Sequence, residues 1–277
     1  MAKLQKGKSW NLPGTTRAII FTLLFLSLLI GGGWIGSMLG LDIYLTTIFL
    51  AALTTLLAFS LRKLVDQESI GSMGWKWKGY ETDFAVGNLI AIAILGAGTC
   101  LLLVMGAVEW AGVEWNSSAF FYSLLLMMIV AVYEELAFRG YIQHNLMESI
   151  HPVKAWVITA VIFAFFHGTN PNGSLLGTFN VFLAGLLLGV NYLYTRNLWF
   201  GIGLHFTWNF LQGPVLGFGV SGLSLPSVLS QSQQGAELWT GGKFGFEASI
   251  LNTLLCLTVT AVLFWVYGKQ HNKKWLP

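Results

Sequence analysis

The sequence predicts an all-α membrane protein, a polytopic bundle of about eight transmembrane helices. Of its 277 residues, 55% are hydrophobic and only 10% are charged, and the mean hydropathy is +0.66. A soluble domain carries about 25% charged residues, so this composition is suited to lipid. The apolar runs are mostly near the ~20 residues that a transmembrane helix needs. Because lipid offers the backbone no hydrogen-bond partners, we expect these runs to be helical.

Eight apolar stretches are candidate spans. The first follows Lys3, Lys6, Lys8 and Arg17, and a basic start of this kind also begins secretory signals. Its apolar run is longer than the ~7–15 residues of a signal peptide and no A-x-A cleavage site follows, so we predict a retained span. The predicted spans are residues 18–39, 43–61, 84–107, 118 to beyond 139, 153–167, 175–194, 198–218 and 246–267.

The basic residues indicate the orientation, because cytoplasmic loops of membrane proteins are enriched in Lys and Arg. If the N-terminus is cytoplasmic and all eight spans cross, every Lys and Arg lies on the cytoplasmic side except Lys243. A missed span would scramble this division. We therefore predict eight spans with both termini in the cytoplasm, and a single integral-membrane domain over residues 1–277.

The remaining composition excludes two classes of function. The net charge is only +3, and the basic residues flank apolar spans instead of forming a patch, so we expect no nucleic-acid partner. Cys100 and Cys256 lie in separate apolar runs. They predict neither a disulfide framework nor a cysteine metal site.

The fourth span carries charged residues where they are costly. Glu134, Glu135 and Arg139 follow an apolar run directly. Ionisable groups at such depth tend to be paired, to face a cavity and to be functional. Glu135 and Arg139 are four residues apart, so on a helix they can pair. Glu134 points about 100° away and need not share that partner, which leaves one carboxylate free for chemistry.

Two of the five histidines lie within apolar runs. His167 comes four residues after Phe163, and His205 comes four residues before Asn209, so each pair shares one face of a helix. A single histidine on an apolar face is usually a buried core residue. Two of them, together with a free glutamate and an asparagine, instead predict a functional site.

These residues can meet only if the fourth helix continues past Arg139. If the helix ended there, Glu134 would lie near the cytoplasmic side and His167 near the opposite side. A helix that runs on to a turn at residues 149–152 places both about 20 Å from that turn, at ~1.5 Å per residue. His205 lies only ~10 Å from the start of its span, so its helix must be tilted or bent.

Three motifs, in this order, resemble the signature of the CPBP family of intramembrane proteases, which comprises type II CAAX prenyl endopeptidases and bacteriocin-processing (ABI family) proteins. They are Glu134-Glu135-x-x-x-Arg139, Phe163-x-x-x-His167 and His205-x-x-x-Asn209. The resemblance covers about residues 118–212, which would form a protease-like core. The first three spans and the last one match only in number and character.

The resemblance implies hydrolysis of a peptide bond in a cavity open to the cytoplasmic half of the membrane. The substrate would be a membrane peptide or a lipidated protein, and the location the bacterial cell membrane. Glu134 would activate water, and His167 would hold this water or shuttle its proton. His205 and Asn209 would stabilise the oxyanion, as fixed donors can. The supporting residues would be Glu135, Arg139 and Phe163.

Two alternatives stay open at the level of the sequence. The reaction would use either no cofactor or a divalent metal such as zinc, since Glu134, His167 and His205 are also a reasonable zinc set. The absence of an HExxH motif favours the metal-free mechanism, as does Asn209, a poor zinc ligand but a good oxyanion donor. The chain could also be a non-enzymatic membrane factor, such as a bacteriocin self-immunity or scaffold protein that retains the motifs. A proton-coupled transporter is disfavoured because no inverted repeat is visible.

Overall fold

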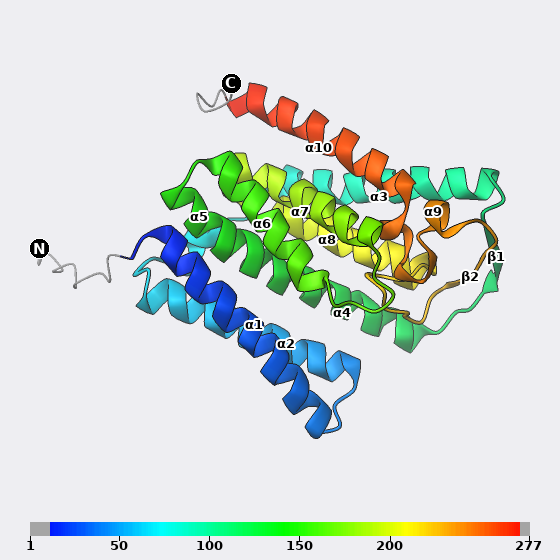
Figure 1. Cartoon of the computed structure of the whole chain (residues 1–277), viewed down its shortest axis with the longest axis horizontal. Coiled ribbons are helices and arrows are strands. Elements are labelled where there is room, and N and C mark those ends of the chain that lie inside the picture. Colours follow the sequence, from blue (N-terminus) through cyan, green and yellow to red (C-terminus); the bar gives the residue numbers. More distant parts are fainter. Residues whose placement is uncertain (1–11, 272–277) are drawn as a thin grey trace, which may run out of the picture.

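Long apolar helices dominate the computed structural model, which describes residues 12–271 (Figure 1). This confirms the predicted all-α class. The longer helices are α1 (Gly14–Met38), α2 (Ile43–Leu64), α3 (Glu81–Val104), α4 (Ser117–Glu135), α6 (Pro152–His167), α7 (Leu175–Thr195) and α10 (Ile250–His271). The shorter α-helices of the same part of the chain are α5 (His144–Ser149), α8 (Trp199–Phe210) and α9 (Glu237–Thr240).

Six described helical segments are long and apolar enough to cross a membrane, and they are α1, α2, α3, Ser117–Ser149, α7 and α10. The other two predicted spans are shorter, since α6 has 16 residues and α8 has 12. The last helix begins at Ile250 and not at residue 246, because Phe246–Ala248 form a separate 3₁₀ turn (η5). The chain is an integral membrane protein. Eight crossings and two cytoplasmic termini remain predictions.

The fourth helix runs unbroken through Ser117–Ser149, so it does continue past Arg139 as predicted. It starts at the Asn116 side chain, which accepts a hydrogen bond from a backbone N–H of the first turn at 3.0 Å. α4 passes into a π-helical segment, Leu136–Gln143 (η2), and then into α5. π-helical turns are frequent at functional sites, and this one directly follows the glutamate pair.

α8 lies in the interior of the bundle, packed against α3, α4 and α7. It approaches α3 closely because Gly87 has no side chain, and a Cβ there would lie 2.3 Å from the Phe200 carbonyl oxygen. α6 packs on α7 and on the π-helical segment, while α10 covers α7 (Figure 1). The helices that carry the predicted catalytic residues are therefore neighbours.

A short antiparallel pair of strands, β1 (Val108–Val113) and β2 (Leu229–Gln233), lies at one end of the molecule (Figure 1). The start of α1 and the end of α10 both lie toward the opposite end. The segment that forms β2 is rich in Gly, Ser and Gln, so it lacks the apolar alternation by which a strand is predicted. The strand pair is the main departure from the helical architecture within the described residues.

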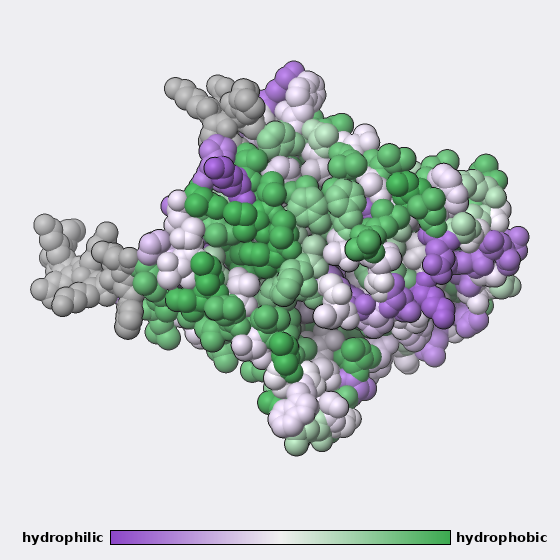
Figure 2. Space-filling view, viewed as in Figure 1, coloured by the Kyte–Doolittle hydropathy of each residue, from purple (hydrophilic) through white to green (hydrophobic). Residues whose placement is uncertain are grey.

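The surface suits a membrane setting. Figure 2 shows apolar side chains over much of the face formed by the central helices, and hydrophilic side chains gathered toward the end that holds β2 and α9. Large apolar side chains such as Ile19, Leu23, Val161 and Phe165 are exposed on these helices. Exposed apolar surface of this extent indicates contact with lipid.

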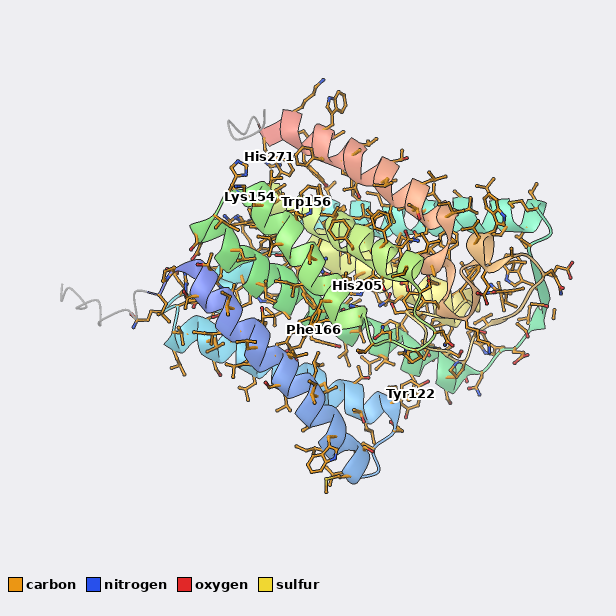
Figure 3. The ribbon with its side chains drawn as sticks, viewed as in Figure 1. Tyr122, Lys154, Trp156, Phe166, His205 and His271 are labelled. Atoms are coloured by element: carbon orange, nitrogen blue, oxygen red, sulfur yellow. The ribbon has the colours of Figure 1, made fainter. Side chains whose placement is uncertain are left out.

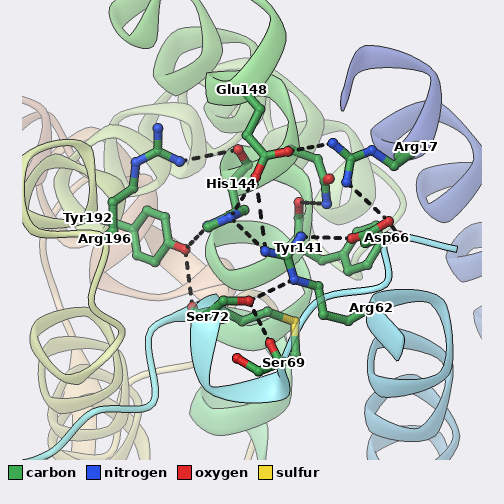
Figure 4. A network of polar contacts seen from close by, with 12 residues as sticks. Arg17, Arg62, Asp66, Ser69, Ser72, Tyr141, His144, Glu148, Tyr192 and Arg196 are labelled. Atoms are coloured by element: carbon green, nitrogen blue, oxygen red, sulfur yellow. Dashed lines mark hydrogen bonds and ion pairs between the residues drawn. The ribbon is translucent and has the colours of Figure 1, made fainter. Parts of the chain in front are cut away.

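A network of charged groups ties α1 and α2 to the end of the fourth helix (Figure 4). Asp66 lies 3.3 Å from Arg17 and 2.9 Å from Arg62. Glu148 pairs with Arg17 and lies 3.1 Å from His144. Because buried charges are stable only when they are paired, this network fixes the α1–α2 hairpin against the helix that carries the glutamate pair.

Candidate active site

Three of the predicted site residues meet at one carboxylate oxygen. Oε2 of Glu134 lies 3.9 Å from Nε2 of His167 and 3.9 Å from Nε2 of His205. This oxygen is buried and has no hydrogen-bond partner among the described residues. A separation of 3.9 Å is too long for a hydrogen bond but leaves room for a bridging water. Since buried polar atoms rarely lack a partner, the arrangement points to a bound water or substrate atom.

Both imidazole rings are oriented by oxygen acceptors. His167 is the last residue of α6, and its Nδ1 donates to the Phe163 carbonyl oxygen at 2.8 Å. His205 lies in α8, and its Nδ1 donates to Oε1 of Glu135 at 3.0 Å. Because carbonyl and carboxylate oxygens only accept, each Nδ1 carries a proton. Each Nε2 therefore faces Glu134, as a base when its ring is neutral.

Glu135 and Arg139 form the pair that their spacing allows. Oε1 of Glu135 accepts from the Arg139 guanidinium at 2.8 Å, and the two side chains are 0% and 1% exposed. Arg139 also donates to the Gly185 carbonyl oxygen at 2.9 Å, which links the fourth helix to α7. The bond from His205 to Glu135 was not predicted. It means that Glu135 orients a histidine of the site in addition to holding the arginine.

The ring of Phe163 packs between these charged groups. Its centroid lies 4.4 Å from that of His167 and 6.2 Å from that of His205. The Arg139 guanidinium lies over the same ring at 4.8 Å, within the range of a cation–π contact. Phe163 therefore supports both imidazole rings and the arginine.

These groups line a cavity of about 280 Å³ inside the bundle. Figure 3 shows His205 in the middle of the molecule, among the helices that enclose this space. Asn209, one helical turn further along α8, also lines the cavity and is 6% exposed. Its side-chain amide has no hydrogen-bond partner among the described residues. Glu134, His167, His205 and Asn209 thus face a common hollow.

The walls of the cavity differ in chemistry. α1, α2 and α4 contribute mainly apolar side chains, and these include Phe25, Leu29, Ile43, Leu126, Met127 and Val130. The segments that follow α6 and α8 contribute polar side chains, and these include Asn170, Ser221 and Glu247. The cavity therefore has one apolar wall and one polar wall, and Glu134, His167 and His205 line the same cavity.

Two polar residues of the cavity were missed by the motif analysis. Tyr133 donates its hydroxyl hydrogen to Oε1 of Glu134 at 3.2 Å. Its position directly before Glu134 and Glu135 could have indicated from the sequence that it belongs to the site. Glu247 lies in η5. It could have been identified from the sequence as a single acidic residue at the start of the predicted span 246–267, where a charge is costly.

One carboxylate and two imidazoles are donors that suit zinc. Both Nδ1 atoms are bonded to oxygen acceptors, as is common for histidine ligands. However, the part of the chain that the structure describes contains no group of three or more His, Cys, Asp or Glu side chains placed to hold a metal ion. The mechanism proposed below uses Glu134 as a base for water and leaves the zinc set as the alternative.

A carboxylate, two imidazoles and an amide around a buried cavity could supply what hydrolysis requires, a base for water and donors for an oxyanion. Here the site lies within a polytopic membrane bundle. Residues 116–211 match the family model described as type II CAAX prenyl endopeptidase Rce1-like. The matched segment runs from the cap of α4 to the end of α8 and makes this part of the chain similar to the CPBP family of proteases. No curated protein matches the chain.

Proposed function

We propose that this protein is an intramembrane endopeptidase that hydrolyses a peptide bond with a water molecule activated by Glu134. The observation that carries the proposal is Oε2 of Glu134, which lies in a cavity 3.9 Å from Nε2 of both His167 and His205. This oxygen has no hydrogen-bond partner in the part of the chain that the structure describes. The match to a family of proteases supports the same class of reaction.

In the proposed reaction, water lies between Oε2 of Glu134 and Nε2 of His167. Glu134 takes a proton from this water while the water oxygen attacks the scissile carbonyl carbon. His167, which faces the same oxygen, holds the water. As the C–N bond breaks, the proton passes from Glu134, directly or through His167, to the leaving amine. The bond from Nδ1 of His167 to the Phe163 carbonyl oxygen keeps Nε2 in place for this step.

The oxyanion would be met by His205 and Asn209. The carboxylate of Glu135 at Nδ1 of His205 stabilises the protonated ring, in which Nε2 also carries a hydrogen and donates. Asn209 supplies an amide that has no other partner among the described residues. Donors fixed in a site of low dielectric stabilise developing charge without reorganisation.

The apolar wall formed by α1, α2 and α4 supports a substrate that lies within the bilayer, either a membrane peptide or a lipidated protein. We further propose that the cavity opens toward the cytoplasmic half of the membrane, in agreement with the distribution of the basic residues. The bacterial cell membrane is the location that the family resemblance implies.

The test is mass spectrometry of peptides released in matched membranes that contain the wild-type protein or the Glu134→Ala variant. We expect products that appear only with the wild type. Glu109→Ala, which removes an exposed acid on β1, serves as the control and should release the same products as the wild type. Identical products from wild type and Glu134→Ala would instead favour the non-enzymatic membrane factor.

A further inference from the structure

Glu247 is a second carboxylate in the cavity, outside the segment that matches the protease family. It is 8% exposed and lines the same hollow as Glu134. Its Oε2 accepts hydrogen bonds from the backbone N–H of Ser221 at 2.8 Å and from the Ser221 hydroxyl at 2.9 Å. Its Oε1 has no hydrogen-bond partner among the described residues, and no Lys or Arg of that part of the chain pairs with it.

The position of Glu247 is fixed from both sides. Its carbonyl oxygen accepts from the Asn180 side chain of α7 at 2.7 Å and from the Asn252 side chain at 3.1 Å. Ser221 has a φ of +47°, a conformation that non-glycine residues seldom adopt. The Asn170 side chain holds the carbonyl oxygen of Ser221 at 3.1 Å. The carboxylate is therefore built into a rigid part of the wall.

Holding the Ser221 loop does not require a negative charge. A glutamine would present a carbonyl oxygen that accepts the same two hydrogen bonds, so the carboxylate adds charge beyond its structural contacts. The cavity already contains Glu134, whereas the charge of Glu135 is balanced by Arg139. Neither Glu134 nor Glu247 pairs with a Lys or Arg among the described residues, and the basic groups near Glu134 are the imidazoles of His167 and His205. Two carboxylates in a low-dielectric hollow attract cations.

We propose that Glu247 binds a positively charged group of the substrate, an ammonium or a guanidinium, beside the bond that is cleaved. The free Oε1 would accept hydrogen bonds from this group, while apolar parts of the same substrate contact the wall formed by α1, α2 and α4. A basic side chain and a free N-terminus offer the same ammonium chemistry. The inference rests on the proposed function for the chemistry, but cation binding is measurable without cleavage.

The experiment measures binding of fluorescent peptides to the full chain in a neutral detergent. Turnover is stopped by Glu134→Gln. The probes are short, N-acetylated, Leu/Ala-rich peptides that carry lysine, norleucine or glutamate at one position, moved along the peptide. We expect the best lysine peptide to bind at least about tenfold more tightly than its norleucine counterpart, as a charge-assisted hydrogen bond would provide. The glutamate peptide should bind most weakly.

Adding Glu247→Gln should remove the preference for lysine and leave the affinity for norleucine nearly unchanged. Adding Glu109→Gln, the same change on the exposed face of β1, should leave the preference intact. A norleucine peptide with a free N-terminus shows whether a terminal ammonium serves as well as a side chain. Equal affinities for lysine and norleucine at every position, or a preference that survives Glu247→Gln, would overturn the proposal.

The comparison among the three peptides needs no change at Glu247, so equal affinities for lysine and norleucine would overturn the proposal even if Glu247→Gln fails to fold. It also separates the two proposals. If lysine peptides bind through Glu247 but the protein with Glu134 intact does not cleave them, the proposed function fails while the cation site stands. If they are cleaved without any preference, the cation site fails alone.

Discussion

Glu134 and Glu135 are adjacent in the chain but differ in their surroundings. Glu135 is fully buried and shares Oε1 between Arg139 and His205. Among the described residues, Glu134 accepts a hydrogen bond only from the Tyr133 hydroxyl, and its Oε2 accepts none. Neighbouring residues of a helix point about 100° apart, which is how one carboxylate became structural and the other remained available.

Replacing Glu135 should cost stability as well as activity. Glu135→Ala leaves the Arg139 guanidinium buried without its carboxylate, and breaking a buried pair in this way typically costs about 3–5 kcal/mol. We expect a lower unfolding temperature in detergent, measured by the change in intrinsic tryptophan fluorescence. Glu114→Ala, on an exposed residue before α4, is the control. An unchanged unfolding temperature for Glu135→Ala would show that the pair contributes little.

Chelators should leave the activity intact. In the proposed mechanism Glu134 acts as a base and not as a metal ligand, and the reaction uses only protein groups and water. The measurement is the rate of peptide cleavage before and after treatment with EDTA and 1,10-phenanthroline. Loss of activity that zinc restores would support the alternative in which Glu134, His167 and His205 are ligands.

At the scale of elements, the structure depends on close approach between the fourth helix and α8. Gly201 of α8 lies against Glu135, where an added Cβ would be 2.5 Å from Oε2 of that glutamate. The same Cβ would also meet the Leu188 carbonyl oxygen at 3.4 Å. A glycine at this position lets the helix that carries His205 reach the helix that carries the glutamates.

Gly201→Ala should therefore displace Glu135 and weaken both the fold and catalysis. We expect a lower unfolding temperature, since overpacking in a core typically costs about 1–3 kcal/mol, and a reduced cleavage rate. Gly96→Ala in α3 is the matched control, because nothing lies within 4 Å of a Cβ there. The control should be neutral or slightly stabilising. Equal behaviour of the two variants would contradict the packing described for Gly201.

The spacing of residues along the sequence predicted the contacts within one helix. It could not predict contacts between residues that are far apart in the chain. Spacing of four residues on a helix predicted the Glu135–Arg139 pair, and matching depth predicted that the fourth helix continues past Arg139. The bond between His205 and Glu135 joins residues 70 positions apart, so no periodicity reveals it. The π-helical segment after the glutamate pair and the role of Glu247 in the cavity wall also depend on tertiary packing.

For the whole molecule, hydropathy predicted the membrane bundle and the bounds of α6, but it overestimated the length of α8. α6 and α8 are shorter than a typical span, and most residues of α8 are buried by its neighbours. Apolar composition alone does not distinguish such an interior helix from one that faces lipid. The distribution of Lys and Arg, in contrast, predicts the orientation of the protein in the membrane, and this prediction can be tested on intact cells.

Cysteine labelling should show residue 109 outside and residue 63 in the cytoplasm. Both Glu109→Cys and Lys63→Cys replace exposed residues, and the exposed Cys100 is first replaced by serine. A membrane-impermeant maleimide should label Glu109→Cys on intact cells and Lys63→Cys only after lysis. The reverse pattern would invert the predicted topology.

The central claim is that Glu134 is the base that activates water. The most direct test is the cleavage rate of the Glu134→Gln variant on a peptide that the wild type is shown to cut, with the unfolding temperature measured in parallel. The amide keeps the size and the bond to Tyr133 but removes the base, so the rate should fall by about 10²–10⁴-fold with the fold retained. A folded Glu134→Gln protein that cleaves at nearly the wild-type rate would contradict the claim.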